Sequence, residues 1–270
     1  MKIIIRNCNV AELDIPLKYA TKLYNEFAIR HPNAFYLRTR QRGMQNWDGK
    51  IKYITKTGQF KIGLLPSVYK RCIELGIKPI IVDMRQPLPK VSKVVTQIGK
   101  YKLRPEQEKA VKAILSNKLG ETPFQIGVLD YTVNAGKTLI MSALYLSYKK
   151  QLKTLLITND SDWLNQARDE FKQYLPGEDI TFVQGKVLNW SNFTIGMVQS
   201  ISRNMRYYQN ELAKIDMVLI DEADQGGSKQ YQNVITRLFN TRVRIGLSGT
   251  IYMSKLAKDK VKNMNLECFF

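Results

Sequence analysis

Two groups of residues in this chain have the types and the spacing that phosphate chemistry requires. The first is the run Thr132-Val133-Asn134-Ala135-Gly136-Lys137-Thr138, between an apolar stretch and a helical one. Backbone N–H groups at the start of a helix face anions, Lys137 would reach the β- and γ-phosphates of a nucleotide, and the Thr138 hydroxyl would bind Mg²⁺. The run therefore predicts a phosphate-binding loop.

The loop departs from the usual pattern at one position. The G-x-x-x-x-G-K-[ST] pattern has Gly where this chain has Tyr131. An ordinary turn before a helix is the alternative interpretation of the same residues.

The second group is a pair of carboxylates, Asp221 and Glu222, directly after the apolar run Met217–Ile220. If that run is a strand of a parallel sheet, the pair lies at its carboxyl end, where such sheets bind ligands. Asp221 would hold Mg²⁺, directly or through water, and Glu222 would polarise the attacking water. A solvated acidic turn is the alternative, but both motifs in this order, each at a strand end, favour a nucleotide site with Lys137, Asp221 and Glu222 as catalytic residues.

From residue 101 onward, strand and helix patterns alternate, and they predict the sheet that must position these motifs. This rhythm predicts an α/β domain over residues 101–270 with a largely parallel, buried sheet. The expected strands are Gln125–Leu129, Thr154–Ile157, Asp179–Val183, Phe193–Val198, Met217–Ile220 and Arg244–Leu247. The expected helices are Glu106–Ser116, Lys137–Lys149, Ser161–Tyr174, Arg206–Ala213 and Lys229–Phe239.

Residues 1–85 predict a separate, small α+β domain, and residues 86–100, with two prolines and no clean period, predict a linker. The expected strands are Lys2–Arg6, Lys50–Ile54, Gln59–Ile62 and Lys78–Val82, with the second and third forming a hairpin around Lys56-Thr57-Gly58. The expected helices are Ile15–Ile29 and Pro66–Leu75.

The positive charge is concentrated in this first part. The chain of 270 residues has a net charge of +19, and residues 1–100 contribute 19 Lys and Arg against 6 Asp and Glu. Clustered cations of this kind follow a phosphate backbone, although a basic surface kept for solubility is the alternative. The expected nucleic-acid contacts are Arg38, Arg40, Arg42, Lys50 and Lys52, while Trp47, Tyr36 or Tyr53 could stack on a base. Trp47 could instead be a core aromatic.

Composition excludes several other classes of protein. A single histidine, His31, cannot supply a His-based zinc site or triad, and no CxxC pair is present. Three widely spaced cysteines indicate free thiols in a reducing compartment. No apolar run of 18 residues and no signal-type N-terminus is found, so a soluble cytoplasmic protein is expected.

Two further segments, together with the two motifs above, make a series of motifs that can be compared with those of a known family. Leu103-Arg104-Pro105-Glu106-Gln107 alone is a good helix start, and Gly246-Leu247-Ser248-Gly249-Thr250 alone is a turn after a strand. Together with the loop and the acidic pair, they make the chain resemble the first motor domain of superfamily 2 helicases and translocases. The resemblance implies a RecA-like fold, ATP and Mg²⁺ as cofactors, and nucleic acid as partner.

The resemblance also implies roles for individual residues. Arg104 and Gln107 would bind ATP, with the Gln107 amide on the adenine edge, and Ser248 and Thr250 would link nucleotide state to DNA movement. Gln166, in the stretch Thr158–Gln166, and Gln199, in Gly196–Ser200, correspond to loops that face nucleic acid. Short polar stretches at strand ends are also common connectors.

The N-terminal block is similar to that of UvsW-type phage DNA helicases, which act on branched recombination and replication intermediates. Arg42–Ile51 and the helix start Gly63-Leu64-Leu65-Pro66 carry this likeness. It implies an ATP-dependent DNA helicase or branch-migration motor in the host cytoplasm, and it favours DNA over RNA.

The family places ATP between two RecA-like lobes, and the second lobe supplies arginine fingers. No Q-x-x-G-R-x-x-R motif is present, so the chain is expected to be the N-terminal half, able to bind ATP and DNA but slow in hydrolysis. Two alternatives remain open. The first is a duplex DNA translocase that does not separate strands. The second is a nucleotide-independent nucleic-acid-binding scaffold, which the departures from the usual phosphate-binding loop at Tyr131 and Asn134 favour.

Overall fold

The computed structural model describes residues 1–91, 93–131, 136–185, 190–249 and 257–270. Contacts divide the chain into two units. The first comprises Met1–Met84 together with helix α10 (Ala257–Glu267), and the second comprises the described residues from Arg85 to Gly249 with Phe270.

The second unit is built on a six-stranded sheet in the order β11-β16-β15-β12-β14-β13, and each pair of neighbours is parallel. The strands are β11 (Ile126–Asp130), β12 (Thr154–Thr158), β13 (Ile180–Val183), β14 (Phe193–Met197), β15 (Met217–Asp221) and β16 (Val243–Ser248). The predicted parallel α/β sheet is therefore confirmed. β12 and β15 are buried along their whole length, as expected of a sheet covered on both faces.

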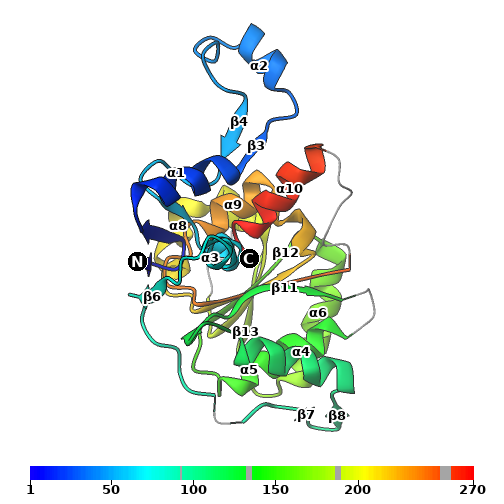
Figure 1. Cartoon of the computed structure of the whole chain (residues 1–270). Helices are drawn as coiled ribbons and strands as arrows, with labels where there is room; N and C mark the ends of the chain where they lie inside the picture. The colour runs from blue at the N-terminus through cyan, green and yellow to red at the C-terminus, as the bar shows by residue number, and fades with distance from the viewer. Residues whose placement is uncertain (92, 132–135, 186–189, 250–256) are drawn as a thin grey trace. The chain divides into compact units, whose positions relative to one another are not determined.

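Helices cover the two faces of this sheet (Figure 1). On one face α5 lies between α4 and α6, and on the other α7 contacts α8 and α9. Their bounds are α4 (Pro105–Ser116), α5 (Lys137–Ser147), α6 (Ser161–Tyr174), α7 (Val198–Arg203), α8 (Met205–Leu212) and α9 (Lys229–Ile235). A 3₁₀ turn, η2 (Ala223–Gly227), follows β15, and the short pairs β7 (Gln97–Ile98) with β8 (Tyr101–Lys102) and β9 (Lys118–Leu119) with β10 (Thr122–Pro123) complete the unit.

The first unit has a four-stranded sheet in the order β5-β2-β1-β6. β1 (Lys2–Ile5) pairs antiparallel with β2 (Val10–Asp14) and parallel with β6 (Ile80–Asp83), and β5 (Gln59–Lys61) pairs antiparallel with β2. The unit also contains α1 (Leu17–Glu26), the 3₁₀ turn η1 (Ile62–Leu64) and α3 (Leu65–Glu74). Arg71 on α3 donates two hydrogen bonds, of 2.8 and 2.9 Å, to the Glu26 carboxylate at the end of α1.

A second, two-stranded sheet extends from this unit (Figure 1). β3 (Ala28–Arg30) pairs antiparallel with β4 (Lys50–Lys52), and the connection between them carries α2 (Ala34–Arg40). Residues 28–52 are called the arm below. The expected helix Ile15–Ile29 was too long, because α1 ends at Glu26 and Ala28 begins β3.

The expected hairpin of Lys50–Ile54 with Gln59–Ile62 was wrong in its partners. A turn does close between Thr55 and Gln59, but only the single bridge Ile54↔Phe60 joins the two predicted strands. β4 pairs with β3, and β5 pairs with β2. Burial explains the second pairing, because Phe60 lies opposite Ala11 of β2 and is only 4% exposed.

Candidate functional site

The carboxyl edge of the six-stranded sheet brings the two predicted motifs together. Lys137 is the first residue of α5, which follows β11, and Asp221 is the last residue of β15. Only β16 separates the two strands. The Lys137 Nζ atom lies 3.6 Å from Asp221 Oδ1, and both side chains are largely buried, as is Thr138. A cation, a carboxylate and a hydroxyl thus converge at one strand edge.

The buried carboxylate of Asp221 lowers the stability of the fold when it is ionised. Its side chain is 5% exposed, and its Oδ1 accepts no hydrogen bond from the described residues. Burial raises the pKa of Asp221, and the nearby Lys137 ammonium opposes that rise. Because the folded state holds the proton more tightly than the unfolded chain does, the ionised carboxylate costs folding free energy at neutral pH, and this cost is lost as pH falls through the folded pKa.

Glu222 follows directly and has an unusual backbone. Its φ of 53° and ψ of 53° lie in the left-handed region, and its side chain is exposed. Partial burial and the neighbouring carboxylate of Asp221 raise the pKa of Glu222, as do Asp224 and Asp160 more weakly. Backbone strain of this kind in a non-glycine residue concentrates at functional sites.

Replacing Glu222 by Gly is expected to stabilise the protein. Glycine adopts φ of +53° without the steric penalty of a Cβ, so we expect the free energy of unfolding to rise by roughly 0.5–1 kcal/mol after the entropy of glycine is subtracted. Urea unfolding of the wild type, Glu222→Gly and Glu222→Ala tests this. Ala keeps the Cβ and is expected to gain nothing. Equal stability of the Gly and Ala variants would show that φ at this position carries no strain.

A third carboxylate connects this edge to the neighbouring strand. Ser248, the last residue of β16, donates a hydrogen bond of 2.9 Å from Oγ to Asp224 Oδ1, and Gln225 Nε2 donates to Asp224 Oδ2 at 3.0 Å. Asp160, which follows β12, caps α6 by accepting from the backbone N–H of Asp162 at 2.8 Å. No role was predicted for Asp160 or Asp224, although the acidic cluster after β15 and the Asp before a helix were visible signals.

The start of α4 reaches the same loop. Gln107 is 3% exposed, and its Oε1 accepts a hydrogen bond of 2.9 Å from the Arg104 backbone N–H in a capping box. Gly136, with φ of 77°, lies against this amide, since a Cβ there would come within 2.4 Å of Gln107 Nε2. The predicted ATP residues Gln107 and Gly136 are therefore in contact. The Arg104 side chain forms an ion pair with Glu106.

The two glutamines expected to face nucleic acid lie at different depths. Gln199, at the start of α7, donates from Nε2 to the Asn159 carbonyl at 3.2 Å, which joins the adjacent carboxyl ends of β14 and β12. Gln166 is in the second turn of α6 and donates to Glu170 at 2.9 Å. Their predicted contacts with nucleic acid stay predictions, and Thr132–Ala135 and Thr250 lie outside the described residues.

The expected nucleic-acid residues of the first unit are on the arm, except Tyr53, which follows it and donates a hydrogen bond to Asn265. Arg38, Arg40, Arg42 and Lys50 are exposed. Lys52 is half-buried, 3.2 Å from an Asp48 oxygen and 4.6 Å from the centre of the Tyr24 ring. Lys50 and Lys52 thus lie on strand β4, and Arg38, Arg40 and Arg42 lie in or just after α2.

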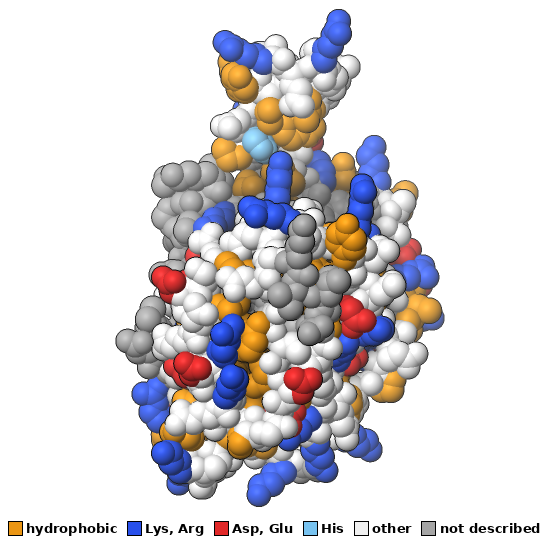
Figure 2. Space-filling view, turned by 180° about the vertical axis from the view of Figure 1, so that it is seen from behind, with side chains coloured by type: hydrophobic (Ala, Val, Ile, Leu, Met, Phe, Trp, Pro, Cys, Tyr) orange, Lys and Arg blue, Asp and Glu red, His pale blue; other side chains and the backbone are white. Residues whose placement is uncertain are grey.

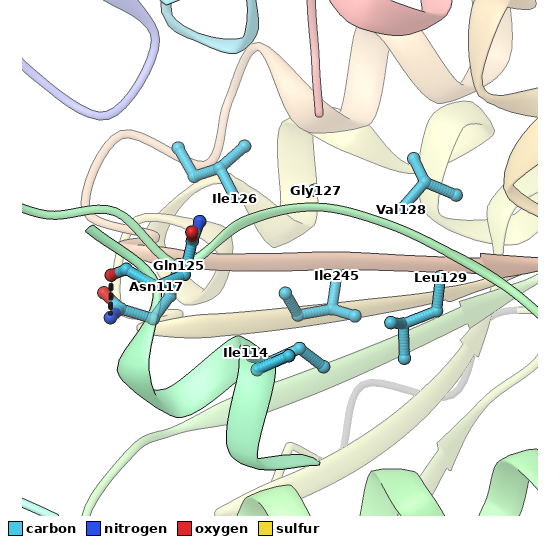
Figure 3. Close-up of a pocket in the computed structure, with 9 residues that line it drawn as sticks. Ile114, Asn117, Gln125, Ile126, Gly127, Val128, Leu129 and Ile245 are labelled. Atoms are coloured by element: carbon cyan, nitrogen blue, oxygen red, sulfur yellow. Dashed lines mark hydrogen bonds between the residues drawn. The ribbon is translucent and has the colours of Figure 1, made fainter. Parts of the chain in front are cut away.

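A cavity of about 180 Å³ lies elsewhere in the second unit, between the end of α4 and β11 (Figure 3). Ile114, Ile126, Leu129 and Ile245 give it an apolar lining, and no lining residue is charged. On its polar wall Gln125 Nε2 donates to the Asn117 carbonyl at 3.1 Å, while Gln125 Oε1 accepts no hydrogen bond from the described residues. Neither Lys137 nor Asp221 lines it, so this cavity does not belong to the candidate site.

The fold and the converging motifs define the second unit as a RecA-like α/β domain with a lysine at a helix start opposite an acidic strand end. Residues 100–253 match the family described as the res subunit of type III restriction enzymes, and the chain belongs to this family. The sequence resemblance to superfamily 2 enzymes is thereby confirmed. None of the helices in the described ranges is long and apolar enough to cross a membrane.

Individual relatives support the same assignment. The chain is 24% identical over 227 residues to the ATP-dependent DNA helicase UvsW of phage T4, and 26% identical over 147 residues to the putative ATP-dependent RNA helicase L396 of Acanthamoeba polyphaga mimivirus. These matches cover 76% and 54% of this chain but only 43% and 27% of the relatives, so the chain spans less than half of their length.

Solved structures extend the likeness to the first unit. A crystal structure of the T4 UvsW helicase superposes with a TM-score of 0.74 at 20% identity and covers 100% of this chain and 98% of that one. A second T4 UvsW structure gives the same score and covers 56% of that chain. The fold of the whole chain, including the small first unit, is therefore that of UvsW.

Proposed function

We propose that this chain is the ATP-binding half of an ATP-dependent DNA helicase or branch-migration motor that acts on forked or branched DNA. The observation that carries the proposal is the 3.6 Å approach of Lys137 to Asp221 at the carboxyl edge of a parallel sheet. The names of the UvsW relatives and their shared fold support the choice of DNA, and with it the cytoplasm of the host cell as the place of action.

The residues of the edge divide the chemistry between them. Lys137 binds the β- and γ-phosphates, while the ATP base is read by Gln107 and Arg104 at the start of α4. Glu222 orients and polarises the attacking water, for which its carboxylate must be ionised. The Ser248–Asp224 hydrogen bond supports coupling of the site to β16, where Ser248 and Thr250 report the nucleotide state.

The donor set fits a magnesium ion that arrives with the nucleotide. Asp221 Oδ1 is buried and accepts no hydrogen bond from the described residues, and the Thr138 hydroxyl belongs to the same edge. No cluster of three or more acidic, His or Cys side chains that could hold a metal by itself is found in the described part of the chain. Mg²⁺ usually takes one or two protein oxygens and completes its shell with phosphates and water, and it would neutralise charge on the phosphates.

A second RecA-like lobe completes the proposed motor. The UvsW and L396 relatives are more than twice as long as the parts that match, which leaves room for such a lobe. An arginine finger from that lobe contributes on the order of 10³-fold or more to phosphoryl transfer in related mechanisms. This chain alone is therefore expected to bind nucleotide and DNA and to hydrolyse ATP slowly.

Fluorescence anisotropy tests the proposal directly. We expect the chain to bind forked DNA more tightly than duplex DNA or matched RNA, to lose affinity steeply with salt, and to change its DNA affinity with MgATP. Lys137→Ala is expected to lose at least about tenfold in MgATP affinity, since a charged hydrogen-bond donor is removed. Lys149→Ala, an exposed lysine just beyond the other end of α5, is the matched control.

Two results would overturn the proposal. Unchanged MgATP binding by Lys137→Ala would remove the nucleotide site from this edge. Equal binding of RNA and forked DNA, together with indifference to nucleotide, would favour a general nucleic-acid-binding scaffold.

The family description favours one second candidate. Because the chain belongs to a family named for a restriction-enzyme subunit, a duplex DNA translocase that does not separate strands is the alternative. Strand-displacement and triplex-displacement assays on the two-lobed protein distinguish the two, since a pure translocase removes a third strand but leaves the duplex paired.

A further inference from the structure

The end of the arm is the most one-sidedly cationic part of the first unit. From Phe27 to Trp47 the sequence contains four arginines and no acidic residue. Arg30, Arg38, Arg40 and Arg42 are all exposed. Figure 2 shows Lys and Arg side chains, in blue, at the end of this extension, and hydrophobic ones between them and the single histidine, which is pale blue.

Two large aromatic side chains lie exposed among these arginines. Phe35 is 80% exposed and Tyr36 is 55% exposed, and both are in α2. The helix buries Ala34, which is 4% exposed and would lie only 3.0 Å from a Cβ at Gly49. Since Ala34 provides the contact that seats α2 on the arm, the fold gains little from the Phe35 and Tyr36 rings. Large exposed apolar groups rimmed by charge mark interaction sites.

Trp47, one of the three aromatic residues predicted as able to stack on a base, has local partners. Its Nε1 donates a hydrogen bond of 3.0 Å to the Lys50 carbonyl. Its ring packs edge-on against His31, with the centroids 5.8 Å apart. These contacts hold the base of the arm together and leave the ring half-buried. A side chain used in this way is poorly placed to receive a base.

We propose that Phe35 and Tyr36 stack on nucleobases that are unpaired or exposed at the end of a duplex, while Arg38, Arg40 and Arg42 hold the adjoining phosphates. The inference rests on the proposed function and names the part of the first unit that touches the DNA. Aromatic rings stack on any base, and guanidinium groups bind phosphate in two-pronged fashion. The Arg40 guanidinium already lies 5.2 Å from the centre of the Tyr36 ring, so one arginine reaches the phosphate next to a base stacked there.

Charge argues against a second copy of the chain on the exposed rings. Its arm would bring four arginines and two lysines against the first arm, with Asp48 as the one acidic residue between 28 and 52, and such an approach is repulsive. A polyanion with flat apolar faces complements both the charge and the rings, and nucleic acid has this chemistry. Because stacking requires a base outside the duplex stack, the arm is expected to prefer DNA with single-stranded ends.

A forked DNA with 2-aminopurine at the first unpaired position provides the test. We expect the double variant Phe35→Ala, Tyr36→Ala to bind it roughly 5- to 150-fold more weakly, the range that stacking on one base contributes. The change in 2-aminopurine fluorescence on binding should disappear with it. Phe35→Trp should keep the affinity, whereas Phe35→Leu should lose it, because leucine keeps the apolar bulk without the aromatic face.

Salt dependence separates stacking from charge. The aromatic variants should keep the wild-type slope of log affinity against log salt, whereas Arg38→Ala should reduce it by about 0.7, the value for one phosphate contact on a single strand. Phe239→Ala, an exposed phenylalanine of the second unit, is the matched control and should behave as wild type. All variants can be compared by MgATP affinity, which should not change.

The inference and the proposed function fail in different ways. If the wild type binds the fork and the double variant binds it equally well, or if Phe35→Leu matches the wild type, stacking by the arm is overturned and the ATP site is untouched. If the wild type itself binds no nucleic acid while MgATP affinity is intact, the DNA-directed function fails.

Discussion

Glu222→Gln is expected to reduce ATP hydrolysis by about 10³-fold while MgATP binding is kept. Removal of a general base in this position costs on the order of 10²–10⁴-fold, and the amide cannot accept the proton of the attacking water. The side chain is exposed, so the fold should be unaffected. The assay uses the protein that joins this chain to the proposed second lobe, with DNA present.

The pH dependence of hydrolysis gives the same residue a second signature. Burial and the carboxylates around Glu222 raise its pKa above the ordinary value of 4.5. Because the ionised form is the active base, the rate should rise with pH through this raised pKa and be flat above it. In Glu222→Gln the residual rate should not show this rise with pH.

The matched control for this prediction is Glu121→Gln. Glu121 is an exposed glutamate of the same unit, in the turn between β9 and β10, and its substitution should leave the rate unchanged. Wild-type hydrolysis by Glu222→Gln would assign the base to another residue. Loss of MgATP binding in the variant would instead indicate that Glu222 holds the nucleotide complex rather than the water.

The second unit could be predicted from sequence because its strands are buried on both faces. Leu155–Ile157 and Met217–Ile220 are continuous apolar stretches, and the first is followed by a helix, α6, whose start is signalled by Asp160. All six predicted strands are present within one or two residues. The order of strands was not predicted, because spacing along the chain does not say that β16 lies between β11 and β15.

Helix ends were predicted less well where tertiary contacts decide them. The helix expected over Lys229–Phe239 ends at Ile235, and α7 over Val198–Arg203 was not expected. α7 packs against α9, and Gly196 before it leaves room for Ile201, whose Cδ1 would be 2.7 Å from a Cβ there. Such close packing is not encoded in a local period.

The first unit was harder because its elements are short and their partners are distant. β3 has three residues, and its partner β4 follows only after the whole connection that carries α2. α10, from the end of the chain, contacts β3, and Tyr53 donates from Oη to Asn265 Oδ1 at 3.0 Å. No pattern in residues 1–85 could indicate this long-range partner. For the same reason the sequence did not predict Phe35 as a stacking residue, since the exposure of its side chain depends on the fold.

Gly136→Ala is expected to lower the free energy of unfolding by about 2–3 kcal/mol and to weaken MgATP binding at least tenfold. Two costs add. The left-handed φ of 77° costs an L-residue about 1–2 kcal/mol. The new methyl group would lie 2.4 Å from Gln107 Nε2, so the amide must move. Because Gln107 is buried and its Oε1 holds the Arg104 N–H, moving it breaks the cap of α4, which is worth about 1 kcal/mol.

A double-mutant cycle separates these costs. Gln107→Ala alone loses the cap, but it also removes the atom that the methyl group introduced by Gly136→Ala would strike. In the Gln107→Ala background the substitution at Gly136 should therefore cost only the backbone strain, so the two single effects should exceed the double effect by about 1 kcal/mol. Gly127→Ala is the control, since a Cβ at that position in β11 meets no atom within 4 Å.

The nucleotide readout shows why this contact matters for function. If Gln107 reads the adenine edge, its displacement in Gly136→Ala should reduce the preference for ATP over GTP together with the affinity, whereas Lys137→Ala should weaken both nucleotides alike. Additive stabilities in the cycle would show that Gly136 and Gln107 do not act on each other. An unchanged preference for ATP over GTP in Gly136→Ala would show that Gln107 does not read the adenine base. Gly136 thus joins Lys137, the residue proposed to bind phosphate, to the residue proposed to read the base, because only hydrogen fits between Gly136 and the Gln107 amide.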